Sequence, residues 1–249
     1  SQSGETRDLI RCLDIAKSNE LITIGVVNVV DSFIARETNC GVYLNAGFEF
    51  AVASTKSFTN QCIILSMVCI WFAQNKDLHI IKRTRIISDL RALYLHINNV
   101  LSKQNDIDII LQNINMNKSF FILGKNNDHA IANEASLKLK EIGYIHAEGF
   151  SSSALKHGPF ALITENLPIF IIDANSFYHS KNNNAFNEVK ARGANTIIIN
   201  ESGDLKIDYN ETFGGVISNI YFQILSYKIA ILKGINPDFP RNLAKVVTV

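Results

Sequence analysis

The sequence predicts an α/β protein built from parallel β-sheets flanked by helices. Short and almost uninterrupted apolar runs alternate along its 249 residues with longer amphipathic segments. Such runs are typical of strands that helices cover on both faces, and their alternation with helices favours βαβ units. The same order appears before and after a polar break at residues 103–106, which indicates two similar domains.

In the first half, the expected elements follow the apolar pattern. A helix is predicted over residues 6–16, a buried strand over 21–27 and a second strand over 41–44. A helix over 57–74 contains the longest apolar run, which is too short to cross a bilayer, so we expect this helix to be buried. A more amphipathic helix is predicted over residues 83–101.

The second half repeats this order. Its strands and helices are predicted, in alternation, at residues 120–124, 131–142, 168–173, 185–192, 196–199 and 216–233. Gly193 and Gly234 follow the last two helices, where glycine commonly ends a helix. The asparagines at 182–184 are expected in a surface loop, and residues 236–249 in an extended tail.

These patterns place one domain at residues 1–78, a helical linker at 79–110, a second domain at 111–240 and a tail at 241–249. A ligand loop in a parallel α/β unit follows the carboxyl end of a strand. The chain opens on such a loop without that strand, so we expect the first domain to be incomplete.

Composition argues against several kinds of partner. The formal net charge is +1, which gives no basic surface for nucleic acid or for a membrane. The four cysteines form no CxxC pair and no metal-ligand cluster with histidine, so no metal is expected. No cofactor is expected either. Cys62 and Cys69 share one helical face and are interpreted as buried, reduced thiols. Reduced thiols and the lack of a signal-peptide pattern favour a cytoplasmic protein.

The first six residues, SQSGET, have the features of a phosphate-binding loop. Ser1, Ser3 and Thr6 place three hydroxyl groups around Gly4 at the predicted start of a helix. Free backbone N–H groups and the helix dipole favour an anion at that position. An ordinary Ser/Thr helix cap is the alternative interpretation.

A second candidate lies on the helix predicted at residues 131–142. Glu134, Lys138 and Glu141 fall at i, i+4 and i+7, on one stripe of that helix. Such a stripe can direct an acid/base carboxylate and a cation into one cleft. The alternative is a solvated salt-bridge face.

Two further residues have side chains suited to catalysis. His157 precedes Gly158 and Pro159 at a predicted turn, where an imidazole can act as a general acid or base or can serve the turn alone. Lys245 in the tail can form a Schiff base with a ketose carbonyl, although a tail lysine is often only solvated.

Taken together, these segments resemble one family. The motifs SQSGET, VASTK, LKLKEI, LKHGP and PRNLAK occur in that order at residues 1–6, 52–56, 137–142, 155–159 and 240–245. They resemble the isomerase portion of the glutamine–fructose-6-phosphate aminotransferases, which consists of two sugar-isomerase (SIS) domains of the flavodoxin-like type. The resemblance extends over the whole chain.

This resemblance implies a site for fructose 6-phosphate. It assigns the phosphate to Ser1, Gln2, Ser3 and Thr6, and contacts with the sugar to Ser54 and to the backbone at Val52 and Ala244. The implied product is glucosamine 6-phosphate for amino-sugar nucleotide synthesis, made by a homodimer or larger oligomer.

The resemblance also implies a role for each catalytic residue. His157 opens the sugar ring and, in this family, is donated by the partner subunit. Lys245 forms a Schiff base at C2 of the open ketose, and ammonia displaces it. Glu141 then moves the proton between C1 and C2, and Lys138 assists the chemistry of the sugar hydroxyls.

Several positions depart from the family pattern. Ala154 stands where a glutamate is usual, Phe48 where a proline is usual, Lys228 where a histidine is usual and Val246 where a serine is usual. None is a residue assigned above, but Ala154 lies three residues before His157. The chain also lacks the glutamine-hydrolysing domain of the family, so we expect that it cannot obtain ammonia from glutamine by itself.

Three alternatives remain open at this point: a sugar-phosphate-binding SIS module without catalysis, a related SIS isomerase or deglycase, and an inactive copy of the enzyme. A binding module needs the phosphate loop but not Glu141, His157 and Lys245 together. The presence of all three favours an enzyme.

Overall fold

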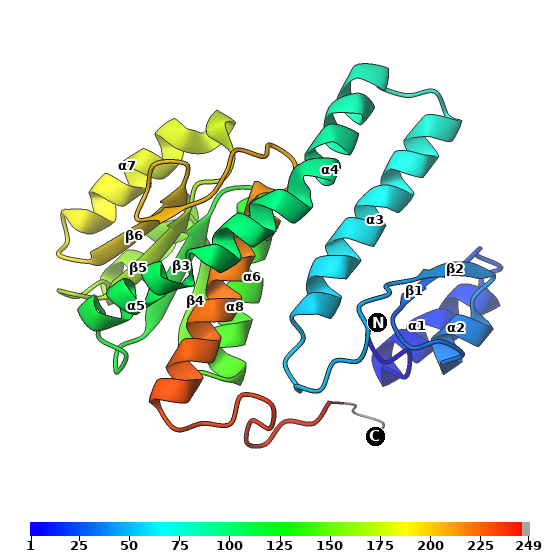
Figure 1. Cartoon of the computed structure of the whole chain (residues 1–249), viewed down its shortest axis with the longest axis horizontal. Helices are drawn as coiled ribbons and strands as arrows, with labels where there is room; N and C mark the ends of the chain where they lie inside the picture. Colours follow the sequence, from blue (N-terminus) through cyan, green and yellow to red (C-terminus); the bar gives the residue numbers. More distant parts are fainter. Residues whose placement is uncertain (246–249) are drawn as a thin grey trace. The chain divides into compact units, whose positions relative to one another are not determined.

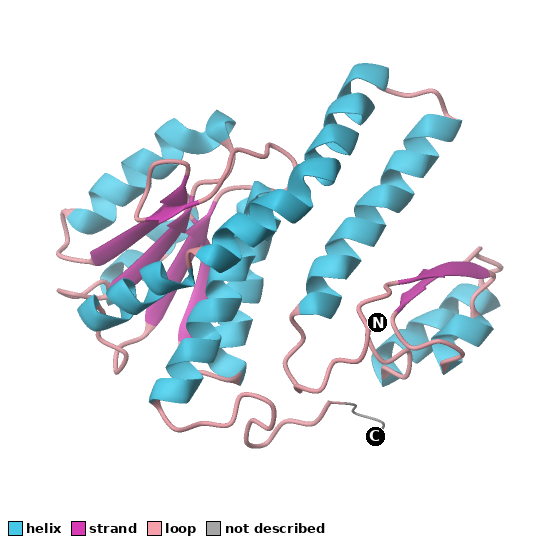
Figure 2. Ribbon diagram, in the orientation of Figure 1, coloured by secondary structure: helices cyan, strands magenta, loops and turns pink. Residues whose placement is uncertain are grey.

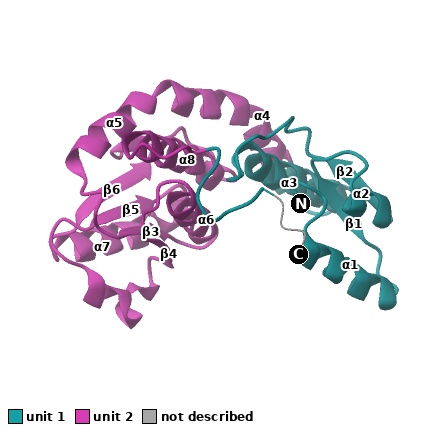
Figure 3. Ribbon diagram, turned by 90° about the horizontal axis from the view of Figure 1, so that it is seen from below, with its two compact units in different colours: residues 1–83, 238–249 teal, residues 84–237 magenta. Residues whose placement is uncertain are grey.

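The computed structural model describes residues 1–245 and divides the chain into two compact units (Figure 3). The first unit comprises residues 1–83 and the tail from Asp238 onward, and the second comprises residues 84–237. Each unit is described separately.

The first unit is built on a short parallel sheet (Figure 1). Its elements are α1 (Arg7–Ser18), β1 (Ile24–Val27), α2 (Phe33–Glu37), β2 (Cys40–Tyr43) and α3 (Lys56–Asn75). The strands β1 and β2 pair in parallel, with Ile24 opposite Cys40. Leu13 of α1, Val27 of β1 and Ile34 of α2 are buried, so the core of this unit forms between these helices and the sheet.

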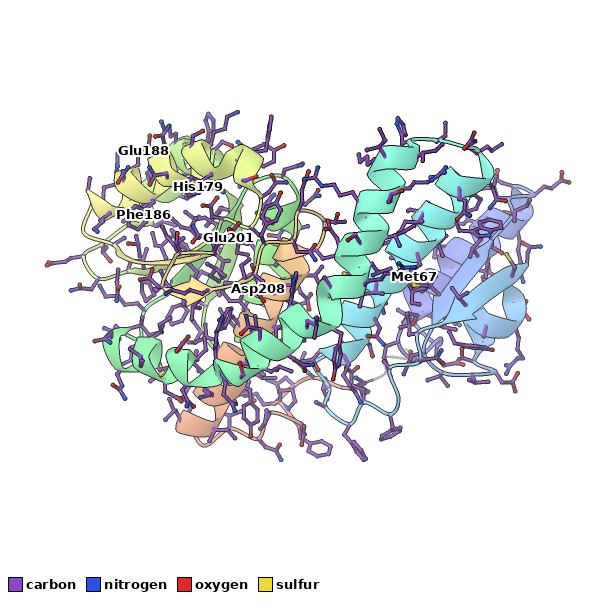
Figure 4. All side chains as sticks on the ribbon, turned by 45° about the horizontal axis from the view of Figure 1, so that its top comes forward. Met67, His179, Phe186, Glu188, Glu201 and Asp208 are labelled. Atoms are coloured by element: carbon purple, nitrogen blue, oxygen red, sulfur yellow. The ribbon has the colours of Figure 1, made fainter. Side chains whose placement is uncertain are left out.

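The prediction that α3 is a buried helix is wrong. Leu65 and Trp71 on this helix are 51% and 59% exposed, and Figure 4 labels Met67, which is also exposed. Cys69 is exposed and Cys62 half-buried, so the expected pair of buried thiols is wrong as well. The reason is that the two-stranded sheet offers too small a surface to cover a helix of 20 residues.

Two helices are long and apolar enough to cross a membrane by length and composition alone: α3, and α8 (Gly214–Leu232) in the second unit. In α8, 61% of the most apolar 18-residue stretch is buried inside the structure, as is typical of a core helix. In α3 the buried share is 11%. The criterion is weak for one or two helices, because core helices of globular proteins also meet it.

The second unit contains a five-stranded parallel sheet, shown in magenta in Figure 2. The strand order is β4-β3-β5-β6-β7, so the chain starts inside the sheet, steps outward once and then continues on the other side, as in flavodoxin-like folds. The strands are β3 (Phe120–Gly124), β4 (Ala147–Ser151), β5 (Pro168–Ile172), β6 (Asn195–Asn200) and β7 (Leu205–Lys206). This order confirms the predicted fold class.

Helices cover both faces of this sheet (Figure 1). The helices from α4 onward are α4 (Ile80–Ser102), which begins among the residues of the first unit, α5 (Gln104–Asn113), α6 (Asn127–Glu141), α7 (His179–Lys190) and α8, with short 3₁₀ turns at Ala154–His157, Pro159–Leu162 and Ser176–Tyr178. All residues of β3 and β5 are buried, as expected for central strands between two helical layers.

Alternate side chains of the central strands enter two separate cores. On one face, Phe121, Leu123 and Ile171 belong to a cluster that includes Val189 of α7 and Leu155. On the other face, the ring of Phe170 meets that of Phe222 of α8 edge-on, with centroids 5.5 Å apart. This alternation fixes the register of the sheet, because a shift of one residue would exchange the two cores.

Two other predictions of local structure differ from the observed fold. The asparagines at 182–184 lie within α7 rather than in a loop, because the buried amide of Asn182 donates to Asp173 at 2.8 Å and so ties this turn of the helix to the sheet. Residues 104–106 of the expected polar break form the first turn of α5. In addition, β4 was not predicted at all. The sequence of β4, AEGFS, has neither an apolar run nor a clear alternation.

Candidate active site

The loop of residues 1–6 is fixed beside the carboxyl end of β1. The backbone nitrogen of Ser1 donates to the carbonyl of Val26 at 2.9 Å, and the N–H of Asn28 donates to the carbonyl of Ser1 at 3.3 Å. Ligands of open parallel sheets bind at this edge. The predicted phosphate loop therefore lies where the fold favours a ligand.

Within this loop, the hydroxyl groups lie close together. The Ser1 and Thr6 hydroxyls are 2.8 Å apart, and the N–H of Gly4 donates to the Ser1 hydroxyl at 3.1 Å. The Ser3 hydroxyl accepts from the N–H of Glu5 at 3.2 Å. Gln2 is half-buried and adjoins these groups in the chain.

Helix α1 starts directly after this loop, and Thr6 is its N-cap residue. The Thr6 side chain makes no capping hydrogen bond to the described helix. The N–H groups of the first turn thus remain available to an anion, which the helix dipole also favours. The carboxylate of Glu5 is held by the N–H of Phe33 at 2.8 Å. The arrangement supports a phosphate loop over an ordinary helix cap.

Gly4 is required by the shape of the loop. Its φ angle is +69°, and a Cβ atom placed on it would lie 1.9 Å from the Ser32 hydroxyl. Any other residue would be strained in this left-handed conformation and would displace Ser32.

A second part of the first unit joins the loop after β2 to the C-terminal tail. The N–H of Val52 donates to the carbonyl of Asp238 at 3.1 Å. The ammonium nitrogen of Lys245 lies 2.9 Å from Oε2 of Glu49. The Ser54 hydroxyl donates to the same carboxylate oxygen at 3.1 Å. Ala244 is exposed beside Lys245.

Glu49 was not identified from the sequence, although it is the centre of this arrangement. It is 6% exposed, and besides Ser54 and Lys245 it accepts from the N–H of Thr55 and from both the N–H and the hydroxyl of Ser57. Burial raises the pKa of Glu49, but the hydrogen bonds from Lys245, Thr55 and Ser57 outweigh burial and lower that pKa to about 2. A single acidic residue in the apolar stretch AGFEFAVAS was the one signal available.

In the second unit, the stripe on α6 is a buried ionic cluster and not a solvated face. Lys138 is 3% exposed, and its ammonium lies 2.6 Å from Glu141 and 3.4 Å from Glu134. Burial raises the pKa of the Glu134 carboxyl, partly offset by Lys138. Glu141 is the most open member, with 21% of its side chain exposed. The predicted pair of Lys138 and Glu141 is therefore in direct contact.

His157 ends a 3₁₀ turn and is exposed. The turn is anchored by Leu155, which is fully buried, and by the ion pair of Lys156 with Glu188 of α7 at 2.8 Å. Figure 4 labels Glu188 on α7. Gly158 follows with a φ of +139°. In the described part of the chain, no hydrogen bond joins this imidazole to Glu141. The turn thus presents the imidazole outward.

The carboxyl edge of the second sheet carries a polar cluster that the sequence did not indicate. Asp173 follows β5 and accepts from His179 at 2.6 Å, Asn182 at 2.8 Å and Asn200 at 3.1 Å. His179 lies at the start of α7, as Figure 4 shows. These three hydrogen bonds to Asp173 connect β5, β6 and α7.

Asp128, in the first turn of α6, adjoins the same edge. It is 3% exposed and accepts from the N–H of Ala174 at 3.3 Å. Burial raises the pKa of Asp128 to about 7, with the nearby charge of Asp173 acting in the same direction. Among residues 1–245, no group of three or more His, Cys, Asp and Glu side chains could hold a metal ion.

The structure therefore brings the predicted residues together in two sets. The first unit holds the loop of Ser1, Gln2, Ser3 and Thr6, and the contacts of Ser54 and Lys245 with Glu49. Val52 is bonded to Asp238 in the same unit, and Ala244 adjoins Lys245 in the chain. The second unit holds Lys138 with Glu141, and His157 on a separate turn. Val246 lies outside the described residues.

Comparison with known proteins identifies the family. The model of the SIS domain matches residues 1–70 and 113–231. All of the chain aligns, at 44% identity, with a probable glutamine–fructose-6-phosphate aminotransferase (isomerizing) of Acanthamoeba polyphaga mimivirus, and at 38% identity with the human aminotransferase of that name numbered 2. The chain spans about two fifths of these relatives, 42% and 38% of their length.

Solved structures show the same likeness. The C-terminal domain of glucosamine-fructose-6-phosphate aminotransferase from Francisella tularensis superposes with a TM-score of 0.90 and 32% identity, over 96% of this chain and 72% of that chain. A glucosamine-6-phosphate deaminase from Thermotoga maritima gives a TM-score of 0.81 at 22% identity, over 99% of this chain and 73% of that chain. At that identity the second likeness concerns the fold alone.

Proposed function

Since the chain belongs to the SIS-domain family, and within it to the C-terminal domain of the glutamine–fructose-6-phosphate aminotransferases, we propose that it converts fructose 6-phosphate and ammonia to glucosamine 6-phosphate. The ammonia derives from glutamine hydrolysed by a glutaminase domain, which the family resemblance implies for the full-length protein. The product enters amino-sugar nucleotide synthesis in the cytoplasm.

In this proposal, the phosphate binds to the loop of residues 1–6. The hydroxyls of Ser1, Ser3 and Thr6, the side chain of Gln2 and the N–H groups at the start of α1 supply the donors. Ser54 and the backbone of Val52 and Ala244 contact the sugar. Binding through a helix terminus and hydroxyl groups needs no metal ion.

The chemistry begins with opening of the sugar ring by His157, which a partner subunit donates in a homodimer or larger oligomer. Its exposed position on an anchored turn suits donation to another chain. Lys245 then condenses with the C2 carbonyl, and ammonia displaces the lysine. Glu141 moves the proton between C1 and C2, and Lys138 assists at the sugar hydroxyls.

The observation that carries this proposal is the contact of Lys138 with Glu141. A buried ammonium 2.6 Å away fixes the carboxylate of Glu141, while a fifth of that side chain remains exposed. Isomerisation requires a carboxylate fixed beside two adjacent carbons, and a sugar-binding module without catalysis does not. The division into SIS domains at 1–78 and 111–240, with a linker at 79–110 and a tail at 241–249, belongs to the same proposal.

The test supplies ammonia directly. The 249-residue chain is incubated with fructose 6-phosphate and ammonium chloride, and glucosamine 6-phosphate is measured by mass spectrometry. We expect product with the natural chain and none with Lys245→Ala. Binding of fructose 6-phosphate without product, or with product that does not depend on Lys245, would contradict the proposal and favour a sugar-sensing module.

A further inference from the structure

Glu49 is a buried carboxylate to which the proposed function assigns no role. It contacts Lys245, which lies 196 positions away in the sequence and is the residue proposed to form the Schiff base. We propose that Glu49 is the positioning residue and counter-ion of Lys245: it holds the ammonium group in place and balances the positive charge of the iminium formed with the ketose. This inference rests on the proposed function.

The first support is the number of donors that converge on Glu49. Oε1 accepts from the N–H groups of Thr55 at 2.9 Å and Ser57 at 3.3 Å. Oε2 accepts from the hydroxyls of Ser54 at 3.1 Å and Ser57 at 2.8 Å, and from the ammonium of Lys245 at 2.9 Å. A protonated carboxyl group would lose one of these acceptor positions, so the site is built for the anion.

A second support is the start of α3, which faces the same carboxylate. Thr55 is the N-cap residue and Ser57 lies in the first turn, where the N–H groups are not used within the helix. The positive end of the helix dipole therefore also stabilises the charge of Glu49. Burial and the bonds to Lys245, Thr55 and Ser57 together leave the pKa of Glu49 at about 2, so the carboxylate stays ionised at neutral pH.

The third support is the charge balance of the reaction. In Schiff-base formation, an ammonium R–NH₃⁺ and a carbonyl O=C become an iminium R–NH⁺=C and water. The C=O bond breaks, a C=N bond forms, and the oxygen leaves with two of the three ammonium protons. The nitrogen carries one positive charge before and after the step, so one fixed anion beside it serves both states. Preorganised charge of this kind needs no rearrangement during the reaction.

The alternative role for Glu49 is structural. Its bonds to Thr55 and Ser57 connect the loop after β2 to the start of α3, and that function alone would explain its burial. The two roles predict different effects for two substitutions. Glu49→Gln removes the charge and keeps an acceptor for the helix, whereas Ser57→Ala removes a helix-side donor and keeps the ion pair.

The test is trapping of the Schiff base. The 249-residue chain is mixed with fructose 6-phosphate, reduced with borohydride, and the adduct at Lys245 is quantified by mass spectrometry. We expect Glu49→Gln to reduce trapping by about tenfold or more, the usual effect of losing a charged hydrogen-bond partner. Its affinity for fructose 6-phosphate, from calorimetric titration, should not change. Ser57→Ala keeps the charge of Glu49 and its contact with Lys245, so it should melt at a lower temperature and lose much less trapping than Glu49→Gln.

Glu49→Asp serves as the conservative variant and should restore part of the trapping. Circular dichroism verifies that each variant is folded at the assay temperature. Trapping by Glu49→Gln at the natural rate, or an equal loss of trapping in Ser57→Ala and Glu49→Gln, would overturn the inference while leaving the proposed function intact. No adduct with the natural chain would overturn both.

Discussion

The ammonium nitrogen of Lys138 lies 2.6 Å from Oε2 of Glu141, three residues further along α6. Only 3% of the lysine side chain is exposed, compared with 21% of the glutamate side chain. The lysine is thus shielded from solvent, whereas part of the glutamate side chain is accessible to it. About a fifth of the Glu141 side chain is therefore open to solvent, as the proposed role of a base requires.

The first prediction concerns Glu141 as the base. Glu141→Gln should slow proton transfer at C1 by about 10²-fold or more, because general base catalysis contributes that much. Incorporation of deuterium from solvent into C1 of fructose 6-phosphate in the presence of ammonium chloride, followed by NMR, measures this step. Glu148→Gln, at an exposed carboxylate paired with His146, is the matched control and should exchange normally. Equal rates in both variants would exclude Glu141 as the base.

The second prediction uses two glycines with similar backbone angles. Gly4→Ala and Gly234→Ala both place a side chain at a positive φ, +69° at Gly4 and +67° at Gly234. Each should lose about 1 kcal/mol of stability from backbone strain. Only Gly4→Ala also displaces Ser32, since no atom lies within 4 Å of the new Cβ at Gly234. The affinity for fructose 6-phosphate, measured by titration, should fall in Gly4→Ala alone.

The third prediction is an increase in stability at high pH for Asp128→Asn. Folding raises the pKa of Asp128 from 3.8 to about 7, so the folded state favours the protonated form. The free energy of unfolding therefore falls as the pH rises through this window, and the full cost is reached above pH ~7. Asp128→Asn keeps an acceptor for the N–H of Ala174 and removes that cost, on the order of 4 kcal/mol. Urea denaturation at pH 4 and pH 8 should show a gain at the higher pH only.

The fourth prediction has the opposite sign and concerns Glu49. Folding lowers the pKa of Glu49 from 4.5 to about 2, so its contribution to stability is complete above pH ~4.5 and is lost as the pH falls toward ~2. Glu49→Gln should therefore cost on the order of 3 kcal/mol at pH 7 and little at pH 2. Urea denaturation across this range measures the difference. A cost independent of pH would show that shape, and not charge, accounts for the effect.

The sequence predicts the central part of the second unit well because its signals are local. The runs FFILG and PIFII are apolar throughout, and each forms a strand that is buried on both faces. β4 has no such signal, since its polar and glycine residues form a strand only through pairing with β3. The helical form of 182–184 likewise depends on hydrogen bonds to Asp173, which lies outside that segment.

Prediction of the site has the same limit. Ser1 to Thr6 and the stripe of Lys138 and Glu141 follow from short spacings, which a sequence displays directly. The pairing of Glu49 with Lys245 joins residues 196 positions apart, and no local pattern encodes it. The exposure of α3 was also out of reach, because an apolar composition does not reveal how much sheet is available to cover a helix.

The first unit is interrupted in sequence, since residues 84–237 are synthesised between its two segments. On the ribosome, the second unit therefore emerges and can fold before residues 238–245 exist. During that interval the nascent first unit has its loop at residues 1–6 and the carboxylate of Glu49, but no Lys245 beside it. Lys245, the proposed nucleophile, is thus the last part of this arrangement to be synthesised, and we expect a chain released early to form no Schiff base with fructose 6-phosphate.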